Sequence, residues 1–295
     1  MDGAFYQIAA RNLLLLKHTK DILVALKQED ISVIVLKGIA LIETVYPQIG
    51  MREIADIDLL VKTKDLSRVS QKLIDLGYIP ERGTSRPTFL MNGKVCVIVQ
   101  LHTDIPYLRE NEIWTDLTTV KIDGEDACVL PLEETLIYLC YHAIVSHLNT
   151  EQKWLEDIHR FVTKYKVEID WEIMAVKIKK YRLTALCYYS FTKVKEIFNS
   201  AIPDIFLSNI KPGNRLQSKI FQRIFNEEVS AYYFSYLLPP LIQPRLIFSY
   251  FFPMPRFLKF RYNVNSPLIY LYYFVRPVHL ISKGIRALWN LFFII

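Results

Sequence analysis

Residues 33–61, VIVLKGIALIETVYPQIGMREIADIDLLV, decide the fold of this chain. The β-branched run at 33–35 predicts a short buried strand that ends at Lys37-Gly38, where the glycine lets the backbone turn into a helix over about 39–46. Pro47 ends that helix, and DIDLLV at 56–61 predicts a second strand. Strand, helix and strand in this order predict an α/β first half.

The flanking segments extend this pattern on both sides. Apolar residues at helical spacing predict an amphipathic helix over about 6–29. A helix from an Asp65 N-cap to about residue 76, closed by Gly77, follows the second strand. Two hairpins complete the first half: strands 88–91 and 94–102 around a two-residue Asn92-Gly93 turn, and strands near Val120 and Cys128 around Asp123-Gly124.

The period becomes helical at Pro131, where a proline and two acidic residues begin PLEETLIYLCYHAIVSHL. Amphipathic segments continue to about residue 226. We therefore expect an α/β domain at 1–130, a helical domain at 131–228 and a tail at 229–295.

Composition favours a globular protein in a reducing compartment. The chain has 295 residues, of which 52% are hydrophobic. Its four cysteines are scattered through apolar stretches without a paired spacing, which is typical of reduced thiols. We see neither a signal peptide nor an apolar run of the ~18 residues that a bilayer core requires. A cytoplasmic location is the expectation.

The charge is unevenly distributed. No Asp or Glu follows Glu228, while that tail retains Arg245, Arg256, Lys259, Arg261, Arg276, Lys283 and Arg286 among many aromatic residues. The body before the tail is close to neutral, which argues against a specific nucleic-acid partner. Basic and aromatic side chains together suit an anionic membrane surface, so the tail either lies peripherally on the inner face of a membrane or packs on the body.

Two carboxylates lead the candidate site residues. In a strand, Asp56 and Asp58 share a face while Ile57 and Leu59 point to the other, so we expect both carboxylates to lie off the core face. Their mutual repulsion favours a divalent cation such as Mg²⁺, as in metal-assisted phosphoryl or nucleotidyl transfer. The alternative is an exposed strand end without function.

Basic groups surround this pair in the sequence. Lys37-Gly38 ends a strand and begins a helix, which places a lysine and backbone N–H groups where phosphates can dock. Arg52 precedes the carboxylates and suits bidentate phosphate binding. The order of strand, Lys-Gly, helix, Arg and DID strand is more specific than any of its parts.

These segments, with LIDLGY, VQLH, PLEETLIYLCYHA, KWLEDIHR and IDWE, resemble the uncharacterised bacterial nucleotidyltransferase family of the polymerase-β-like superfamily over residues 33–171. The resemblance implies an α+β fold, with a small mixed β-sheet core flanked by helices. It also implies an NTP substrate and a Mg²⁺ cofactor held by Asp56 and Asp58. By the same resemblance Lys37, Gly38 and Arg52 bind the nucleotide.

One departure from that family stands out. Superfamily members usually supply a third carboxylate from a later strand, where this chain has Gln100 on the face of His102. A neutral amide cannot act as a base, so His102 or Asp104 takes that role, or metal activates the acceptor, or activity is lost. His102 has an alternative as a structural residue at a strand end.

The leading hypothesis is thus a Mg²⁺-dependent nucleotidyltransferase that releases pyrophosphate. The sequence does not identify the acceptor. The acceptor could be a small molecule, a sugar, a lipid-linked group or a protein. The alternative is a catalytically degenerate relative that serves as a nucleotide-binding or membrane-surface interaction module. No Ser-His-Asp order, zinc signature, P-loop or dinucleotide fingerprint is present.

Overall fold

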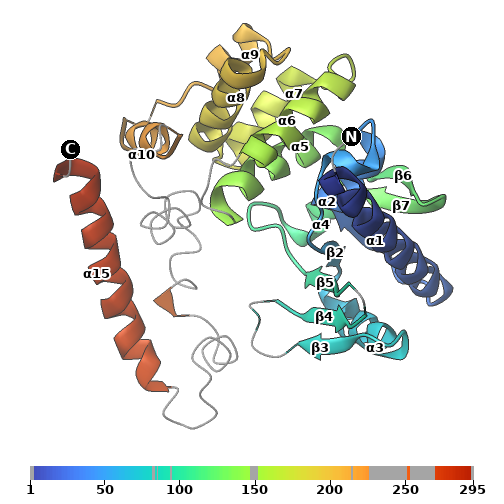
Figure 1. The fold of residues 1–295 in the computed structure, drawn as a ribbon. Helices are drawn as coiled ribbons and strands as arrows, with labels where there is room; N and C mark the ends of the chain where they lie inside the picture. The colour runs from blue at the N-terminus through green and yellow to red at the C-terminus, as the bar shows by residue number, and fades with distance from the viewer. Residues whose placement is uncertain are drawn as a thin grey trace. The chain divides into compact units, whose positions relative to one another are not determined.

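The computed structural model describes residues 3–81, 84, 86–93, 95–146, 152–213, 215–225, 251–252 and 270–293. The chain divides into two compact units, Met1–Thr135 and Leu136–Ile295 (Figure 1). The boundaries expected at 130 and 228 stay predictions, and much of the tail falls outside the described residues.

The first unit alternates short strands with helices. Its elements are α1 (Gly3–Gln28), β1 (Val33–Leu36), α2 (Lys37–Thr44), η1 (Ile49–Met51), β2 (Ile57–Val61), η2 (Thr63–Asp65), α3 (Leu66–Asp75), β3 (Ile79–Glu81), β4 (Thr88–Met91), β5 (Val97–His102), α4 (Glu110–Ile113), β6 (Thr118–Ile122) and β7 (Glu125–Val129). The strands form one seven-stranded sheet in the order β3-β4-β5-β2-β1-β7-β6. The prediction of an α+β fold is confirmed.

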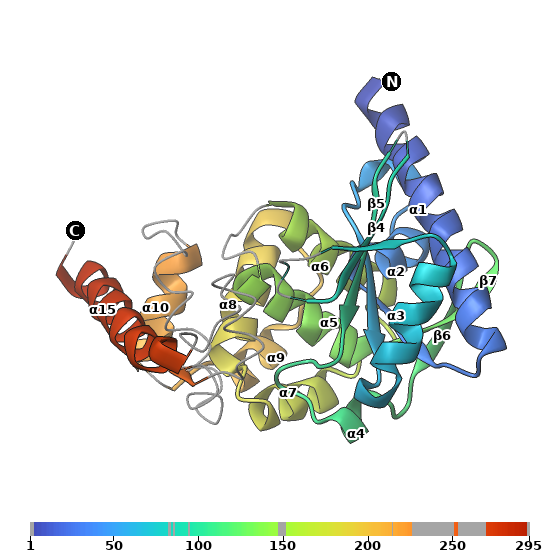
Figure 2. The ribbon, with the colours of Figure 1, turned by 90° about the horizontal axis from the view of Figure 1, so that it is seen from below.

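The sheet is mixed, and its centre holds the two strands predicted first. β1 runs antiparallel to β2, while β1 pairs with β7 and β2 with β5 in parallel. The helices α1, α2 and α3 lie on one face of this sheet (Figure 2). Every residue of β1 and β2 is buried. The short apolar runs at 33–36 and 57–61 are therefore central strands covered on both faces.

Two of the predicted turns have the expected backbone. Asp123 and Gly124 both have positive φ, 47° and 80°, as a two-residue hairpin turn between antiparallel β6 and β7 requires. Gly77 has a φ of 92° and follows the end of α3. The Tyr78 N–H donates to the carbonyl oxygen of Leu73, which completes a left-handed glycine cap.

One local prediction is wrong, and a second is confirmed in its position but not in its side-chain hydrogen bond. Met91 pairs with Val97, so more than two residues separate β4 from β5, and Asn92-Gly93 is not a two-residue turn. Asp65 stands at the N-cap of α3, but its side chain accepts no capping N–H. Its Oδ1 contacts Arg68 Nη1 at 3.2 Å instead, because the turn η2 precedes the helix.

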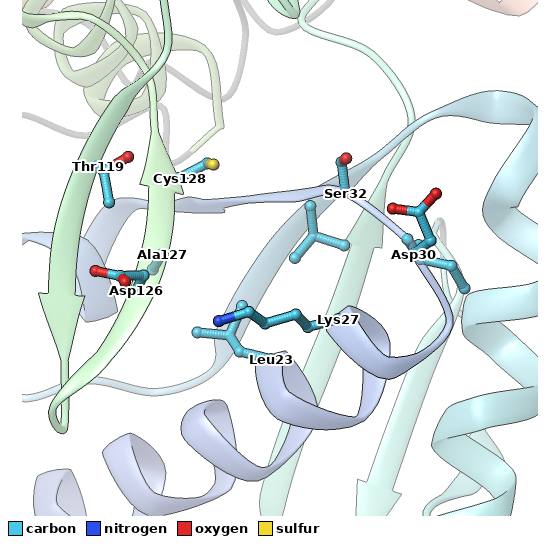
Figure 3. Close-up of a pocket in the computed structure, with 10 residues that line it drawn as sticks. Leu23, Lys27, Asp30, Ser32, Thr119, Asp126, Ala127 and Cys128 are labelled. Atoms are coloured by element: carbon cyan, nitrogen blue, oxygen red, sulfur yellow. The ribbon is translucent and has the colours of Figure 1, made fainter.

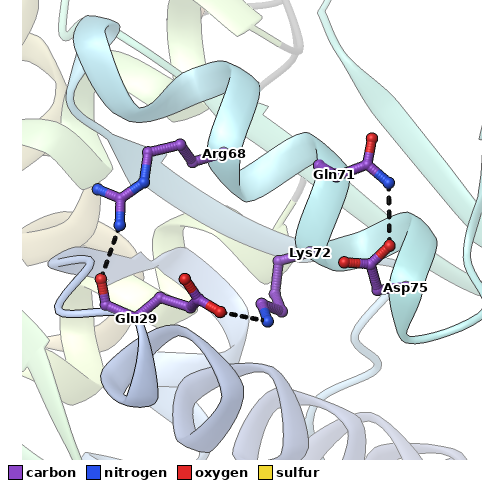
Figure 4. A network of polar contacts seen from close by, with 5 residues as sticks. All are labelled: Glu29, Arg68, Gln71, Lys72 and Asp75. Atoms are coloured by element: carbon purple, nitrogen blue, oxygen red, sulfur yellow. Dashed lines mark hydrogen bonds and ion pairs between the residues drawn. The ribbon is translucent and has the colours of Figure 1, made fainter.

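A polar network ties the end of α1 to α3 (Figure 4). Arg68 Nη2 donates to the carbonyl oxygen of Glu29 at 2.8 Å, and Lys72 Nζ donates to Glu29 Oε1 at 2.6 Å. Gln71 donates to Asp75 within α3 at 2.9 Å. These contacts are exposed, so their contribution is orientation of the helices more than stability.

In the second unit, the described residues are helical, apart from the turns that join the helices. Its elements are α5 (Leu132–Tyr141, which begins in the first unit), a π-helical turn (His142–Ser146), α6 (Gln152–Tyr165), α7 (Trp171–Lys180), α8 (Thr184–Phe198), α9 (Asp204–Asn209), α10 (Arg215–Phe225) and α15 (Tyr272–Phe293). Asp170 caps α7 by accepting the N–H groups of Glu172 and Ile173. The Trp171 ring packs against Phe206 and Phe191, as a core residue at a helix start does. Among the described helices, none is both long and apolar enough to cross a membrane.

Candidate active site

The turn from β1 into α2 places Lys37 and Gly38 at the carboxyl end of a central strand. Lys37 itself has a φ of 53°, a left-handed conformation that a non-glycine residue adopts at a cost. The sequence suggested that Gly38 allows the turn, but the residue with the left-handed conformation is Lys37. The missing side chain of Gly38 instead admits Ile54, because a Cβ on Gly38 would lie 3.2 Å from Ile54 Cγ2. The glycine thus brings the segment before Asp56 against the turn.

Asp58 lies at the centre of the candidate site. It is 3% exposed, and its Oδ1 receives both Lys37 Nζ at 2.8 Å and His102 Nε2 at 2.7 Å. The register explains this convergence, since Asp58 pairs with Leu36 of β1 and with Gln100 of β5. Asp58 is nevertheless buried, so it does not lie at an exposed strand end.

These contacts set the charge states of the pair. Burial alone would raise the pKa of Asp58, but the hydrogen bond from His102 and the charge of Lys37 outweigh it and lower the pKa to about 2. Burial lowers the pKa of His102 in turn, against the opposing effect of Asp58. At neutral pH the ring is therefore neutral and donates its Nε2–H to an ionised carboxylate.

Asp56 occupies a different environment at the start of β2. It is half-buried, and burial followed by the charge of Asp58 raises its pKa to about 6. Lys37 and Arg52 lower that pKa, so both cations act on Asp56 electrostatically. The two carboxylates are therefore neighbours whose negative charges oppose each other, as the sequence predicted.

Arg52 is buried beside this pair. Its Nη1 donates to the carbonyl oxygen of Glu53, which folds the guanidinium back along the segment that leads to Asp56. The structure thus gathers Lys37, Arg52, Asp56 and Asp58 around one strand end. His102 joins them through Asp58.

Two residues of α1 were not found by sequence reasoning. Asn12 is fully buried and donates to the carbonyl oxygens of Ile49 and Arg52, both at 2.6 Å. Arg11 donates to the carbonyl oxygens of Ile54 and Ala55 at 3.0 and 3.1 Å. Together they hold the loop before β2. The one sequence signal was a polar Asn on the apolar side of an amphipathic helix.

Gln100 lies directly beside Asp58 on the neighbouring strand, as their register pairing shows. It is half-buried and neutral, so the position of the expected third carboxylate carries an amide. Asp104 lies two residues beyond β5 and is exposed. His102 is almost fully buried and its Nε2 is engaged by Asp58, which suits orientation of that carboxylate.

The donor set fits a hard divalent cation. Two carboxylates whose negative charges repel each other offer oxygen ligands and gain from a positive charge between them. Both contacts to Asp58 use Oδ1, so Oδ2 takes part in neither. Within the described part of the chain, no group of three or more His, Cys, Asp or Glu side chains is arranged to hold a metal. The pair would therefore need oxygens from substrate or water.

A pocket of the first unit lies elsewhere (Figure 3). It has a volume of about 270 Å³ and is lined by residues at the amino end of β1, including Ser32 and Val33, with Lys27 and Cys128. Since Lys37 follows the carboxyl end of β1, this pocket and the carboxylate pair lie at opposite ends of that strand.

The helical unit contains the KWLEDIHR segment of the resemblance. Asp157 is buried in α6, while Arg160 contacts Glu156 one turn earlier at 2.7 Å. The rings of Trp154 and His142 meet edge to face, with centroids 5.1 Å apart. His147 lies outside the described residues.

The solved structures that align with the chain include two of the antibiotic-resistance factor ANT(2″)-Ia. The crystal structure in complex with adenylyl-2″-tobramycin is 16% identical, covers 57% of this chain and 97% of its own, and has a TM-score of 0.40. The solution structure of this antibiotic-resistance factor is 15% identical, covers 63% and 98%, and has a TM-score of 0.41. No curated protein matches.

A family model matches residues 1–199, a span that includes the sheet, the Lys37–Asp58–His102 contacts and α6 to α8. Its description is that of an uncharacterised nucleotidyltransferase, and nucleotide transfer is the chemistry of such a family. The chain belongs to this uncharacterised nucleotidyltransferase family.

Proposed function

We propose that the protein transfers a nucleotide from an NTP to an acceptor, depends on Mg²⁺ and releases pyrophosphate. The observation that carries this proposal is the coupled pair Asp56 and Asp58 beside two cations at one strand end. Carboxylates supply metal ligands, and Lys37 and Arg52 supply charges for a triphosphate. The family match supports nucleotide transfer in general.

Asp56 and Asp58 would hold the metal ion. When bound, Mg²⁺ supplies charge neutralisation at the carboxylates and polarisation of phosphate oxygens. The low pKa of Asp58 keeps this carboxylate ionised at neutral pH. Burial, and after it the charge of Asp58, raises the pKa of Asp56, so a nearby cation would favour the ionised form of Asp56.

Lys37 and Arg52 would bind the triphosphate together with backbone N–H groups of the first turn of α2, which have no partner within the helix. In the structure Lys37 Nζ contacts Asp58. An arriving phosphate would compete for this amine and leave Asp58 to the cation. Gly38 contributes through its small size, because the absence of a side chain lets the segment around Ile54 lie close to the turn at Lys37 and Gly38.

In the transfer step an acceptor hydroxyl or phosphate oxygen attacks the α-phosphorus. The new bond joins that oxygen to the α-phosphorus, the bond to the β-phosphate oxygen breaks, and pyrophosphate leaves. A hydroxyl acceptor loses its proton to solvent. His102, which we proposed as catalytic from sequence, suits a positioning role: its Nε2–H fixes the orientation of Asp58.

A second candidate is nucleotide binding without turnover. The observation that favours it is Gln100 beside Asp58, because no described carboxylate occupies that strand position to act as a base. This candidate predicts the same Mg²⁺-dependent binding and no transfer.

For location, we propose a cytoplasmic protein that lies peripherally on the inner face of an anionic membrane. The acid-free tail after Glu228 supports this proposal, since basic residues alone remain to meet anionic lipid. A lipid-linked acceptor would then be available at the membrane surface. The site equally admits small-molecule, sugar and protein acceptors.

Calorimetric titration of each NTP, with and without Mg²⁺, tests the site. We expect Asp56→Asn and Asp58→Asn to abolish Mg²⁺-dependent binding, while Asp126→Asn, the same change on the exposed Asp126–Lys121 pair of β6 and β7, leaves it intact. Because Asp58 is buried, circular dichroism must show that its variant remains folded. Equal NTP affinity in the wild type and in a folded Asp56→Asn variant would refute the proposal.

A further inference from the structure

Helix α15 exposes a continuous line of large apolar side chains. Phe274, Val278, Ile281, Ile285 and Trp289 are each between 51% and 77% exposed. Their spacings of four, three, four and four residues put all five on one face of the helix. An ordered apolar stripe of this length on a surface marks an interaction site, because its exposure to water is unfavourable.

The opposite side of α15 is the one that packs. Leu280 and Arg276 are buried and lie one turn apart. The helix therefore already has a covered face, and the exposed line is a second face with a separate use.

The charge of the chain around α15 indicates what binds its exposed face. From residue 229 to the end of the chain there is no Asp or Glu, whereas α15 carries Lys283 and Arg286 besides the buried Arg276. Apolar residues with nearby basic residues are the pattern of helices that lie in the headgroup region of anionic bilayers. The helix does not meet the requirements for crossing a membrane, so an in-plane position is the one that fits.

We propose that the face of α15 formed by Phe274, Val278, Ile281 and Ile285 inserts into the surface of an anionic lipid bilayer, with the helix axis along the membrane plane. This inference rests on the peripheral location proposed above and makes it specific. It is independent of the carboxylate site, since those residues belong to the first unit.

The test is co-sedimentation of the full chain with vesicles of phosphatidylcholine and phosphatidylserine, and with vesicles of phosphatidylcholine alone. The double variant Ile281→Asp/Ile285→Asp places two carboxylates in the apolar face. The matched control is Val176→Asp/Ile205→Asp, which adds the same charge at positions of α7 and α9 that are 66% and 74% exposed. NTP binding is measured for each protein.

We expect the wild type to bind the anionic vesicles, more weakly at high salt, and to bind the neutral ones much less. The α15 double variant should lose about tenfold or more in vesicle affinity. In the lipid-bound state each substitution replaces an aliphatic side chain inserted into the bilayer by a charge that the apolar lipid excludes. The control should bind like the wild type.

Three outcomes would overturn the inference: no binding to anionic vesicles, equal binding of both double variants, or self-association of the wild type that the α15 substitutions abolish. The last would assign the face to a second copy of the chain. Unchanged NTP binding in the α15 variant shows that the protein is folded. Loss of lipid binding alone therefore leaves the transferase proposal standing, and loss of NTP binding alone leaves the lipid proposal standing.

Discussion

Asp56 should make the metal-free protein less stable at neutral pH, and its removal should reverse that effect. Its pKa of about 6, against an ordinary 3.8, means that the folded protein holds the Asp56 proton more tightly than the unfolded chain does. The stabilising contribution is fully present below pH ~4 and is lost as the pH rises through about 6. Above that pH Asp56 is ionised in a half-buried position beside Asp58, which destabilises the folded state.

The magnitude follows from the shift. About two pKa units at 1.36 kcal/mol each give an upper limit of about 3 kcal/mol, and because Asp56 is only half-buried we expect about 1–3 kcal/mol. Asp56→Asn removes the charge with little change of shape. Its free energy of unfolding at pH 8 should therefore exceed that of the wild type by this amount, with little difference at pH 4.

The assay is thermal and urea unfolding in the presence of a chelator, at pH 4, 6 and 8. Asp126→Asn is the control, since Asp126 is exposed and its hydrogen bond with Lys121 lowers its pKa, so its replacement should not stabilise the protein. Added Mg²⁺ should stabilise the wild type and leave Asp56→Asn unchanged. An Asp56→Asn variant no more stable than the wild type at pH 8, or equally stabilised at pH 4 and pH 8, would refute the electrostatic argument.

Substitutions at three further residues, Gln100, His102 and Asn12, test the surroundings of the pair. Gln100→Ala should cost about 1 kcal/mol of transition-state stabilisation in kcat/KM, and Gln100→Glu should raise kcat by restoring a carboxylate; a loss as complete as that of Asp58→Asn would contradict this role. His102→Ala should destabilise the protein by about 1.5–3 kcal/mol in urea unfolding and raise the pKa of Asp58 in an NMR titration, and an unchanged pKa would exclude the positioning role. Asn12→Ala should lower the free energy of unfolding by about 2 kcal/mol or more and weaken NTP binding, because two buried carbonyl oxygens lose their donor; full stability would show that water replaces the amide.

Much of the fold could be predicted because it depends on local patterns. The β-branched run of β1, the apolar run of β2 and the Asp123-Gly124 turn each specify one conformation within a few residues. The Asn92-Gly93 turn failed because pairing of β4 with β5 is fixed by the buried register, with Met91 opposite Val97. Local turn preference yields to tertiary packing in that hairpin.

The candidate site could be predicted from the sequence only in part, because much of it also depends on tertiary packing. The spacing of Asp56 and Asp58 is local, but the convergence of Lys37 and His102 on one oxygen depends on which strands neighbour β2. Asn12 likewise acts across 37 and 40 residues of sequence, through backbone carbonyl oxygens that carry no sequence signature. The turn after β1 was expected to depend on Gly38, because glycine is the most permissive residue, but the residue with the left-handed φ is Lys37.

The central claim, nucleotide transfer at the carboxylate pair, is tested most directly by label transfer. Purified protein is incubated with Mg²⁺, cell extract and each NTP, labelled at the α-phosphate in one series and at the γ-phosphate in a parallel one. The account predicts that the wild type moves the α-label onto an acceptor and releases the γ-label as pyrophosphate, and that Asp56→Asn does neither. Transfer of the γ-label to an acceptor, or equal α-label transfer by the wild type and Asp56→Asn, would contradict it.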